Sequence, residues 1–88
     1  MDESENLLEF PCQFPIKVMG RDQAGFEAHV LELISAHVSD VTHDNVAVRG
    51  SRNGNFLSIT VTIQATSRDQ LDNVYRALTA SKLILYVI

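Results

Sequence analysis

The chain has 88 residues, 45% of them hydrophobic and 20% charged, which is typical of one small globular domain rather than of a disordered segment. Its net charge of −4 argues against binding to nucleic acid or to an anionic membrane, since both select basic surfaces. The single cysteine, Cys12, excludes a disulfide within the chain. There is no secretory leader pattern and no apolar run long enough to span a bilayer, so we expect a cytoplasmic protein.

The first residues differ in composition from the rest of the chain. Segment 1–6 is polar and contains three acidic residues, Asp2, Glu3 and Glu5. We therefore predict a flexible acidic tail over 1–6 and a single domain over 7–88. Three apolar residues, Leu7, Leu8 and Phe10, form a short entry segment before the first strand.

Strict alternation predicts the first strand at Gln13–Met19. The inward positions are Phe14, Ile16 and Val18, and the outward positions are Pro15, Lys17 and Met19. We expect Gly20 to end the strand.

A helix is predicted from about Ala24 to Val38, with Asp22 as its N-cap. Its apolar face consists of Phe26, Val30, Leu33, Ile34 and Val38. Gly25 falls within the first predicted turn, where glycine costs roughly 0.5–1 kcal/mol relative to alanine.

A weaker strand over Val41–Arg49 and a strong one over Phe56–Ala65 follow this helix. Between them, Asn53-Gly54 predicts a hairpin with a type I′ turn, which needs positive φ at both central residues. The buried face of the strong strand is Leu57, Ile59, Val61 and Ile63.

The second helix is predicted to begin with a capping box, Ser67-Arg68-Asp69-Gln70. Its apolar face is Leu71, Val74, Tyr75 and Leu78, and a last strand spans Leu83–Ile88.

This β-α-β-β-α-β order predicts an α+β fold of the ferredoxin-like kind. Two amphipathic helices would cover one face of a four-stranded antiparallel sheet, because right-handed crossovers leave few other arrangements. The first and third strands, which show the clearest alternation, would be central.

No group of residues has the spacing of a known catalytic or metal site. Metal binding needs clustered ligands, but His29 and His37 are eight residues apart and His43 lies in another predicted element. The sequence places no base beside Cys12, as nucleophilic catalysis would require. We therefore expect no catalytic residue, no metal and no cofactor, that is, a protein that is not an enzyme.

The predicted outward positions of the sheet also argue against RNA binding. RNA-recognition motifs share this topology and stack bases on exposed aromatic residues of the central strands. The outward positions here include Lys17, Met19, Ser58 and Thr60, with Phe56 as the only aromatic residue nearby.

Two features suggest binding. The last strand is apolar on both faces, although the topology places it at an edge of the sheet. Either Leu7, Leu8 and Phe10 cover it, or a second copy of the chain covers it in a homodimer with Tyr86 as a contact.

The second feature is the loop Gly20–Gly25. The glycine at the helix start either serves a tight turn or exposes backbone N–H groups to a carboxylate.

Segment Asn6–Gly20, NLLEFPCQFPIKVMG, resembles the opening of the YbeD-like family of small bacterial proteins, in which LLEFP and a phenylalanine precede KVMG. The likeness continues in Gly54-Asn55-Phe56 and covers nearly the whole chain. It implies a fold like that of ACT-type regulatory domains, no assigned activity, and a genomic context of lipoate biosynthesis.

Segment Asp22–Phe26, DQAGF, also resembles the ACT-domain signature, in which Asp-x-x-Gly opens the first helix. In ACT domains the glycine lets an amino-acid ligand approach the backbone at a subunit interface. The resemblance implies Asp22, Gly25 and Phe26 as ligand-binding residues.

Our leading hypothesis is a non-enzymatic, ACT-like regulatory or adaptor module that acts as a dimer and binds an unidentified protein partner, with Lys17, Met19 and Tyr86 as its contact surface. The alternative is a sensor that binds an amino acid or another small carboxylate at Asp22–Phe26.

Overall fold

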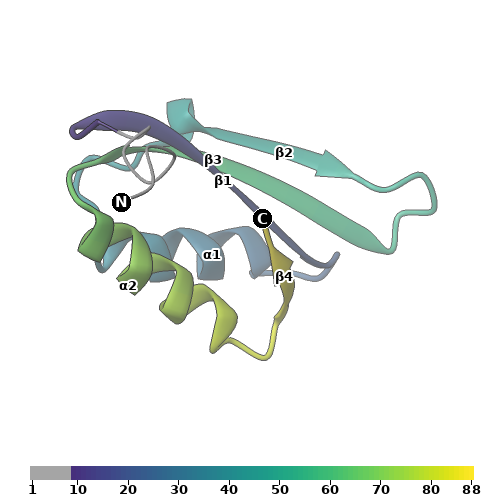
Figure 1. Cartoon of the computed structure of the whole chain (residues 1–88). Coiled ribbons are helices and arrows are strands. Elements are labelled where there is room, and N and C mark those ends of the chain that lie inside the picture. The colour runs from purple at the N-terminus through teal and green to yellow at the C-terminus, as the bar shows by residue number, and fades with distance from the viewer. Residues whose placement is uncertain (1–8) are drawn as a thin grey trace.

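The computed structural model describes residues 9–88 and contains the predicted order of elements (Figure 1). These are β1 (Cys12–Arg21), α1 (Phe26–Ser35), the 3₁₀ turn η2 (His43–Asn45), β2 (Val46–Gly50), β3 (Phe56–Ala65), α2 (Arg68–Thr79) and β4 (Ile84–Val87). The predicted acidic tail, together with Leu7 and Leu8, lies outside the described residues.

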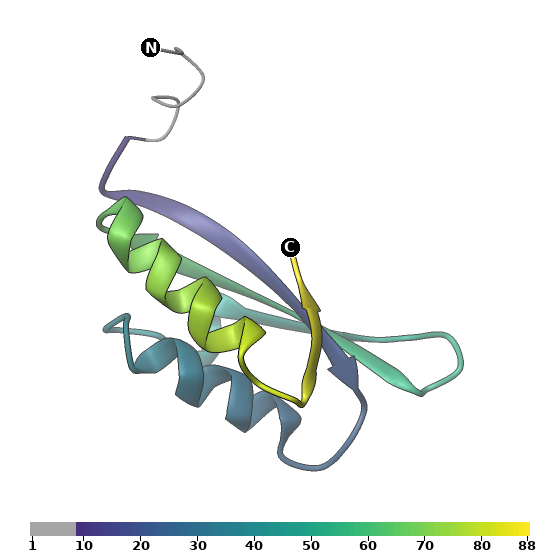
Figure 2. The same ribbon diagram turned by 60° about the horizontal axis from the view of Figure 1, so that its bottom comes forward.

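The four strands form one antiparallel sheet in the order β2-β3-β1-β4. Both helices lie on the same face of this sheet, and no helix or strand within residues 9–88 covers the other face (Figures 1 and 2). The prediction of a ferredoxin-like fold with the first and third strands at the centre is therefore confirmed.

The core lies between the sheet and the helices, and the predicted periodicities account for it. Ile16 and Val18 of β1 are fully buried, whereas the intervening Lys17 is exposed. The other strands and helices contribute Ile59, Val61, Ile63, Ala65, Phe26, Val30, Ile34, Leu71, Val74 and Leu78.

The prediction that Gly20 ends the first strand is wrong, because Gly20 lies inside β1. It pairs with Leu57 on one side and Ile84 on the other, so the ladder continues to Arg21. A Cβ at Gly20 would lie 2.5 Å from Cε1 of Phe26 and 2.8 Å from the carbonyl oxygen of Leu83. Glycine is needed here because the Phe26 ring packs directly on the strand.

The first helix begins later than predicted, so the assignment of Asp22 as N-cap is wrong. Gly25 is the N-cap, with φ of 86° and no side-chain capping hydrogen bond. Glycine adopts this left-handed conformation without steric penalty. We expected Gly25 to weaken the first turn of the helix. Instead, it lies before that turn and lets the chain change direction where the helix begins.

The hairpin between β2 and β3 is not a type I′ turn. Among the described residues of this loop only Gly54 has positive φ (77°). The Gly54 N–H donates to the Ser51 carbonyl (3.0 Å), and the Ser51 hydroxyl accepts from the Asn55 and Phe56 N–H groups (both 3.2 Å). A longer loop built on Ser51 replaces the two-residue turn.

The predicted strand over Val41–Arg49 and the capping box are confirmed only in part. Residues 43–45 form the 3₁₀ turn, so β2 keeps only the second half of the predicted segment. The Ser67 hydroxyl accepts from the Gln70 N–H (3.1 Å), as expected. The Gln70 side chain, however, accepts from the Thr66 N–H (2.7 Å) instead of returning to Ser67.

The edge strand β4 is short and stays largely exposed. It pairs only with Val18–Gly20 of β1, through a bulge beside Gly20. Phe10 lies at the opposite end of β1, where Cys12 pairs with Ala65, and is half-buried against the core. Phe10 is therefore too distant from β4 to cover it, although one of the two alternatives for the last strand required this.

Candidate functional site

The predicted ligand-binding residues at the helix start do not form one cluster. Asp22 is exposed, and its N–H donates to the Asn55 carbonyl of the β2–β3 loop (2.9 Å). Gly25 and Phe26 line a groove, and Asp22 does not. The Phe26 side chain is only 1% exposed and belongs to the core.

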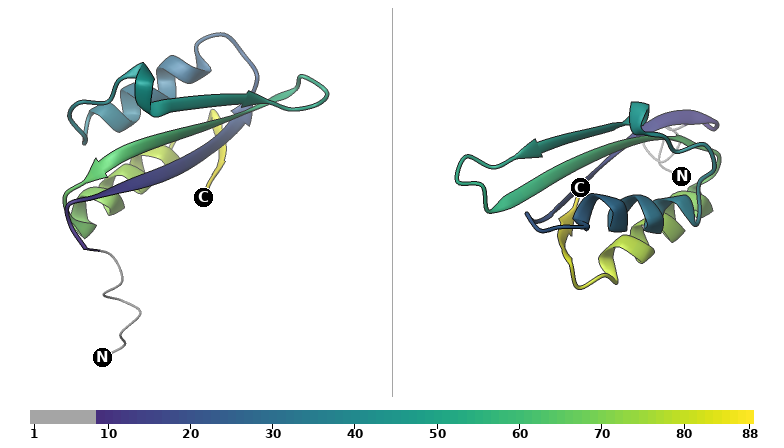
Figure 3. Two further views of the ribbon diagram at one scale, coloured as in Figure 1. Left: turned by 90° about the horizontal axis from the view of Figure 1, so that it is seen from above. Right: turned by 180° about the vertical axis from the view of Figure 1, so that it is seen from behind.

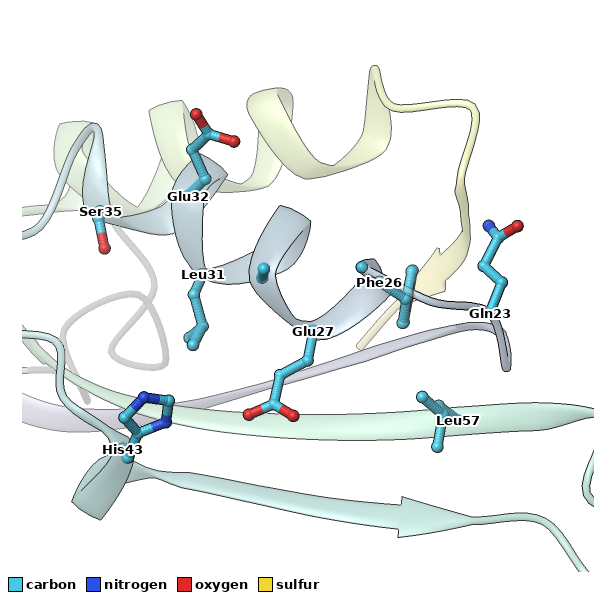
Figure 4. Close-up of a pocket in the computed structure, with 10 residues that line it drawn as sticks. Gln23, Phe26, Glu27, Leu31, Glu32, Ser35, His43 and Leu57 are labelled. Atoms are coloured by element: carbon cyan, nitrogen blue, oxygen red, sulfur yellow. The ribbon is translucent and has the colours of Figure 1, made fainter.

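The groove, of about 650 Å³, lies between α1 and the part of the sheet nearest β2 (Figure 4). The residues that line it are Gln23, Gly25, Phe26, Glu27, Ala28, Leu31, Glu32, Ser35, His43 and Leu57. The side chains of Glu27 and Leu31 point from α1 toward the sheet, whereas Glu32 points away from it. None of the lining residues is a lysine or arginine, so the groove suits an ammonium group better than a carboxylate.

The second candidate is the uncovered face of the sheet, which we call the open face (Figure 3, left). Residues directly opposite each other in neighbouring strands point to the same face. By this register its members are Gln13, Pro15, Lys17, Met19, Arg21, Ala47, Arg49, Phe56, Ser58, Thr60, Thr62, Gln64 and Tyr86.

The structure brings together the three predicted contact residues on the open face. Met19 lies directly opposite Tyr86, which is 55% exposed. Lys17 is two residues from Met19 in β1, and its N–H and carbonyl exchange hydrogen bonds with Ile88 (3.2 and 2.8 Å). Residues from both ends of the chain thus share one surface.

Three further members of the open face, Arg21, Phe56 and Arg49, were not predicted from the sequence to belong to this surface. The Arg21 guanidinium lies over the Phe56 ring, 5.7 Å from its centroid, as cation–π contacts require. Arg49 of β2 lies directly opposite Ser58. One signal was available in the sequence: the segments that form the four strands contain no aspartate or glutamate.

The titratable groups indicate no other site in the described residues. No three His, Cys, Asp or Glu side chains among them are close enough to hold a metal ion. His29 Nε2 lies 2.7 Å from the Ser81 hydroxyl, which links α1 to the loop before β4. Burial raises the pKa of Tyr75, whose hydroxyl donates to the Ile88 carbonyl (3.4 Å).

No helix in residues 9–88 is long and apolar enough to cross a membrane.

These observations define a small ferredoxin-like domain of the ACT-like kind with one open sheet face. The chain belongs to the family described as "Protein of unknown function (DUF493)", which matches residues 5–88. This agrees with the predicted resemblance to YbeD-like bacterial proteins.

The relatives by sequence are proteins of similar length. A UPF0250 protein of Nitrosomonas europaea is 53% identical over 74 residues, which cover 84% of this chain and 85% of that protein. A UPF0250 protein of Neisseria gonorrhoeae is 43% identical over 91 residues and is matched over the full length of both.

Solved structures support the fold. Protein HP0495 of H. pylori superposes with a TM-score of 0.78 at 12% identity and covers 99% of this chain and 91% of that one. The ACT domain of a GTP pyrophosphokinase from Chlorobium tepidum superposes with a TM-score of 0.66 at 17% identity, covering 86% and 84%. At these identities the likeness concerns the fold alone.

Proposed function

We propose that this protein is a non-catalytic regulatory or adaptor module that binds another protein through the open face of its sheet. One observation carries the proposal: the helices cover only one face, and the other presents exposed Tyr86 and Phe56 beside Met19. Exposed aromatic residues grouped on one face are typical of protein contact surfaces. The resemblance to the YbeD-like family predicts that this partner acts in lipoate biosynthesis.

A different protein fits this face better than a second copy does. In a two-fold contact through the open face, Lys17, Arg21 and Arg49 of one copy would meet the same three cations of the other. No carboxylate on any strand would offset that repulsion. A homodimer through the exposed edge of β4 stays a separate prediction, which sedimentation at high concentration tests.

The experiment is capture of a partner from native cell lysate with the tagged full chain and two variants. Tyr86→Asp places a charge on the open face and should abolish capture. Asn73→Asp is the control, because it adds the same charge at an exposed position of α2, on the side of the sheet away from the open face. Melting temperatures must show that both variants fold. Equal capture by the two variants would refute the proposal.

The groove beside α1 supports a second candidate, a small-ligand sensor. Its volume of about 650 Å³ is in the range of ligand pockets. The Glu27 carboxylate that points into it favours an amine-bearing ligand, such as an amino acid held by its ammonium group.

A thermal-shift panel of amino acids and polyamines tests the sensor, because a ligand that binds the native state raises Tm by mass action. A true ligand should lose its shift with Glu27→Gln and keep it with Glu32→Gln, since Glu32 points away from the sheet. No shift with any compound would exclude these ligand classes.

A further inference from the structure

Resting on the proposed function, we infer that the partner presents an acidic segment, and that Lys17 and Arg49 bind its carboxylates over the hydroxyl groups of Ser58 and Thr60. The basis is a separation of charge between the two faces of the domain. Of the chain's seven basic residues, three lie on the open face, namely Lys17, Arg21 and Arg49. None of the acidic residues within 9–88 lies in one of the four strands.

The register places the two cations and the two hydroxyl groups next to one another. Lys17 of β1 lies directly opposite Thr60 of β3, and Arg49 of β2 lies directly opposite Ser58. Ser58 and Thr60 are two residues apart in one strand, so their side chains point to the same face about 7 Å apart. Each cation is therefore the direct neighbour of one hydroxyl group and the diagonal neighbour of the other.

The surface between the two cations is hollowed. A depression of about 280 Å³ lies there, and it is lined by Lys17, Ala47, Val48, Arg49, Ser58 and Thr60. An adjoining depression of about 240 Å³ is lined by Lys17 and Arg49 and also by Met19, Phe56 and Ser58. A guanidinium, an ammonium and two hydroxyl donors can together satisfy the oxygen atoms of one or two carboxylates.

The flanks of this site are apolar, which specifies the partner further. Met19 lies two residues from Lys17 along β1, between Ser58 of β3 and Tyr86 of β4, and Phe56 lies two residues from Ser58 toward the hairpin. Arg21 already covers the Phe56 ring. The fitting segment therefore combines two or three acidic side chains with one apolar anchor on Met19 and Tyr86.

Protein carboxylates fit this face better than the phosphates of a nucleic acid. The chain as a whole has a net charge of −4, which opposes a polyanion whose affinity depends on many phosphate contacts. The two aromatic residues of the open face lie apart from the middle of the central strands: Phe56 is at the hairpin end of β3 under Arg21, and Tyr86 is on the edge strand β4. The outward positions between them, such as Pro15, Thr60 and Thr62, provide no aromatic platform for bases.

The test uses labelled short peptides with one leucine-phenylalanine pair flanked by glutamates, by glutamines or by lysines, and an oligothymidine of similar length. Binding to the full chain is followed by fluorescence anisotropy, and amide chemical shifts locate the contact. We expect the glutamate peptide to bind about tenfold more tightly than the glutamine peptide, with affinity falling between about 50 and about 200 mM salt. The amides of Ser58 and Thr60 should shift.

Charge-reversal variants with matched controls assign the effect to the site. Lys17→Glu and Arg49→Glu should each weaken the glutamate peptide about tenfold. Lys82→Glu, in the loop before β4, and Arg68→Glu, at the start of α2, alter the net charge equally and should change the affinity less than about twofold, since neither residue lines the two depressions.

Three results would overturn the inference: equal binding of glutamate and glutamine peptides, equal losses in the control variants, or equal binding of oligothymidine through the same residues. A failure of this inference differs from a failure of the proposed function. If Tyr86→Asp abolishes partner capture while Lys17→Glu and Arg49→Glu leave it intact, the open face binds a protein but not through carboxylates. If none of the three variants matters, the proposed function itself is wrong.

Discussion

Substitution of Gly20 by alanine should destabilise the protein, although the residue lies in a regular strand. The added methyl group would lie 2.5 Å from Cε1 of Phe26 and closer still to Cζ, and 2.8 Å from the Leu83 carbonyl oxygen. The ring is 1% exposed and is packed within the core, so it can move only by disturbing its neighbours, and the carbonyl belongs to the backbone. Overpacking of this kind lowers the free energy of unfolding by about 2 kcal/mol, which corresponds to a fall in Tm of roughly 8–16 °C for a domain of this size.

The assay is urea denaturation of the variant beside two glycine controls. Gly50→Ala places its methyl group in open space without positive φ, so it should change stability by less than about 0.5 kcal/mol. Gly25→Ala also meets no neighbouring atom but retains a φ of 86°, and should cost about 1–2 kcal/mol from backbone strain alone. The two controls separate steric overlap from strain.

Truncation of the ring tests the cause directly. In the double variant Gly20→Ala/Phe26→Leu the ring atoms nearest the new methyl group are gone, so the two changes should be coupled by about 1 kcal/mol or more. The rescue stays incomplete, because the Leu83 carbonyl remains. If Gly20→Ala is as stable as Gly50→Ala, or if the two changes are additive, the packing argument is refuted.

Three further predictions concern the helix cap, the hairpin and the C-terminus. Ser67→Ala removes the hydroxyl that caps α2 and should lower the free energy of unfolding by about 1 kcal/mol in urea denaturation. Gly54→Ala should cost about 1 kcal/mol, because φ is 77° there, whereas Asn53→Ala should be nearly neutral; a type I′ turn would make both costly. Burial raises the pKa of Tyr75 in the folded protein, so the Tyr75 hydroxyl ionises at a lower pH in the unfolded chain. The free energy of unfolding should therefore fall as pH rises above about 10. Tyr75→Phe should lessen that alkaline loss in thermal melts, and an unchanged alkaline profile would contradict the assignment.

The sequence predicted the elements whose side chains repeat with a clear period. Ile16 and Val18, and Ile59 with its neighbours in β3, alternate strictly because one face of a half-covered sheet must be apolar. The element boundaries were less accurate. Gly20 looked like a strand end, since nothing local shows that Phe26 will occupy the space of its missing side chain.

The helix start illustrates a second limit. Asp22 has good capping chemistry, and only the path of the chain between β1 and α1 reveals that Gly25 takes the cap position with positive φ. The main-chain hydrogen bond from Asp22 to Asn55 ties that loop to a hairpin distant in sequence. Local propensity contains no information about such a partner.

The amino-acid sequence by itself determined the order of the elements, the faces that are buried and the family, because these depend on periodicity and motifs along the chain. Only the tertiary structure decided which residues of different strands are neighbours on the open face. Lys17, Arg49 and Tyr86 come from three strands, and the sheet order with its register makes them neighbours. A contact between residues far apart in sequence depends on how the strands pair, and that pairing is decided by burial of the whole core at once.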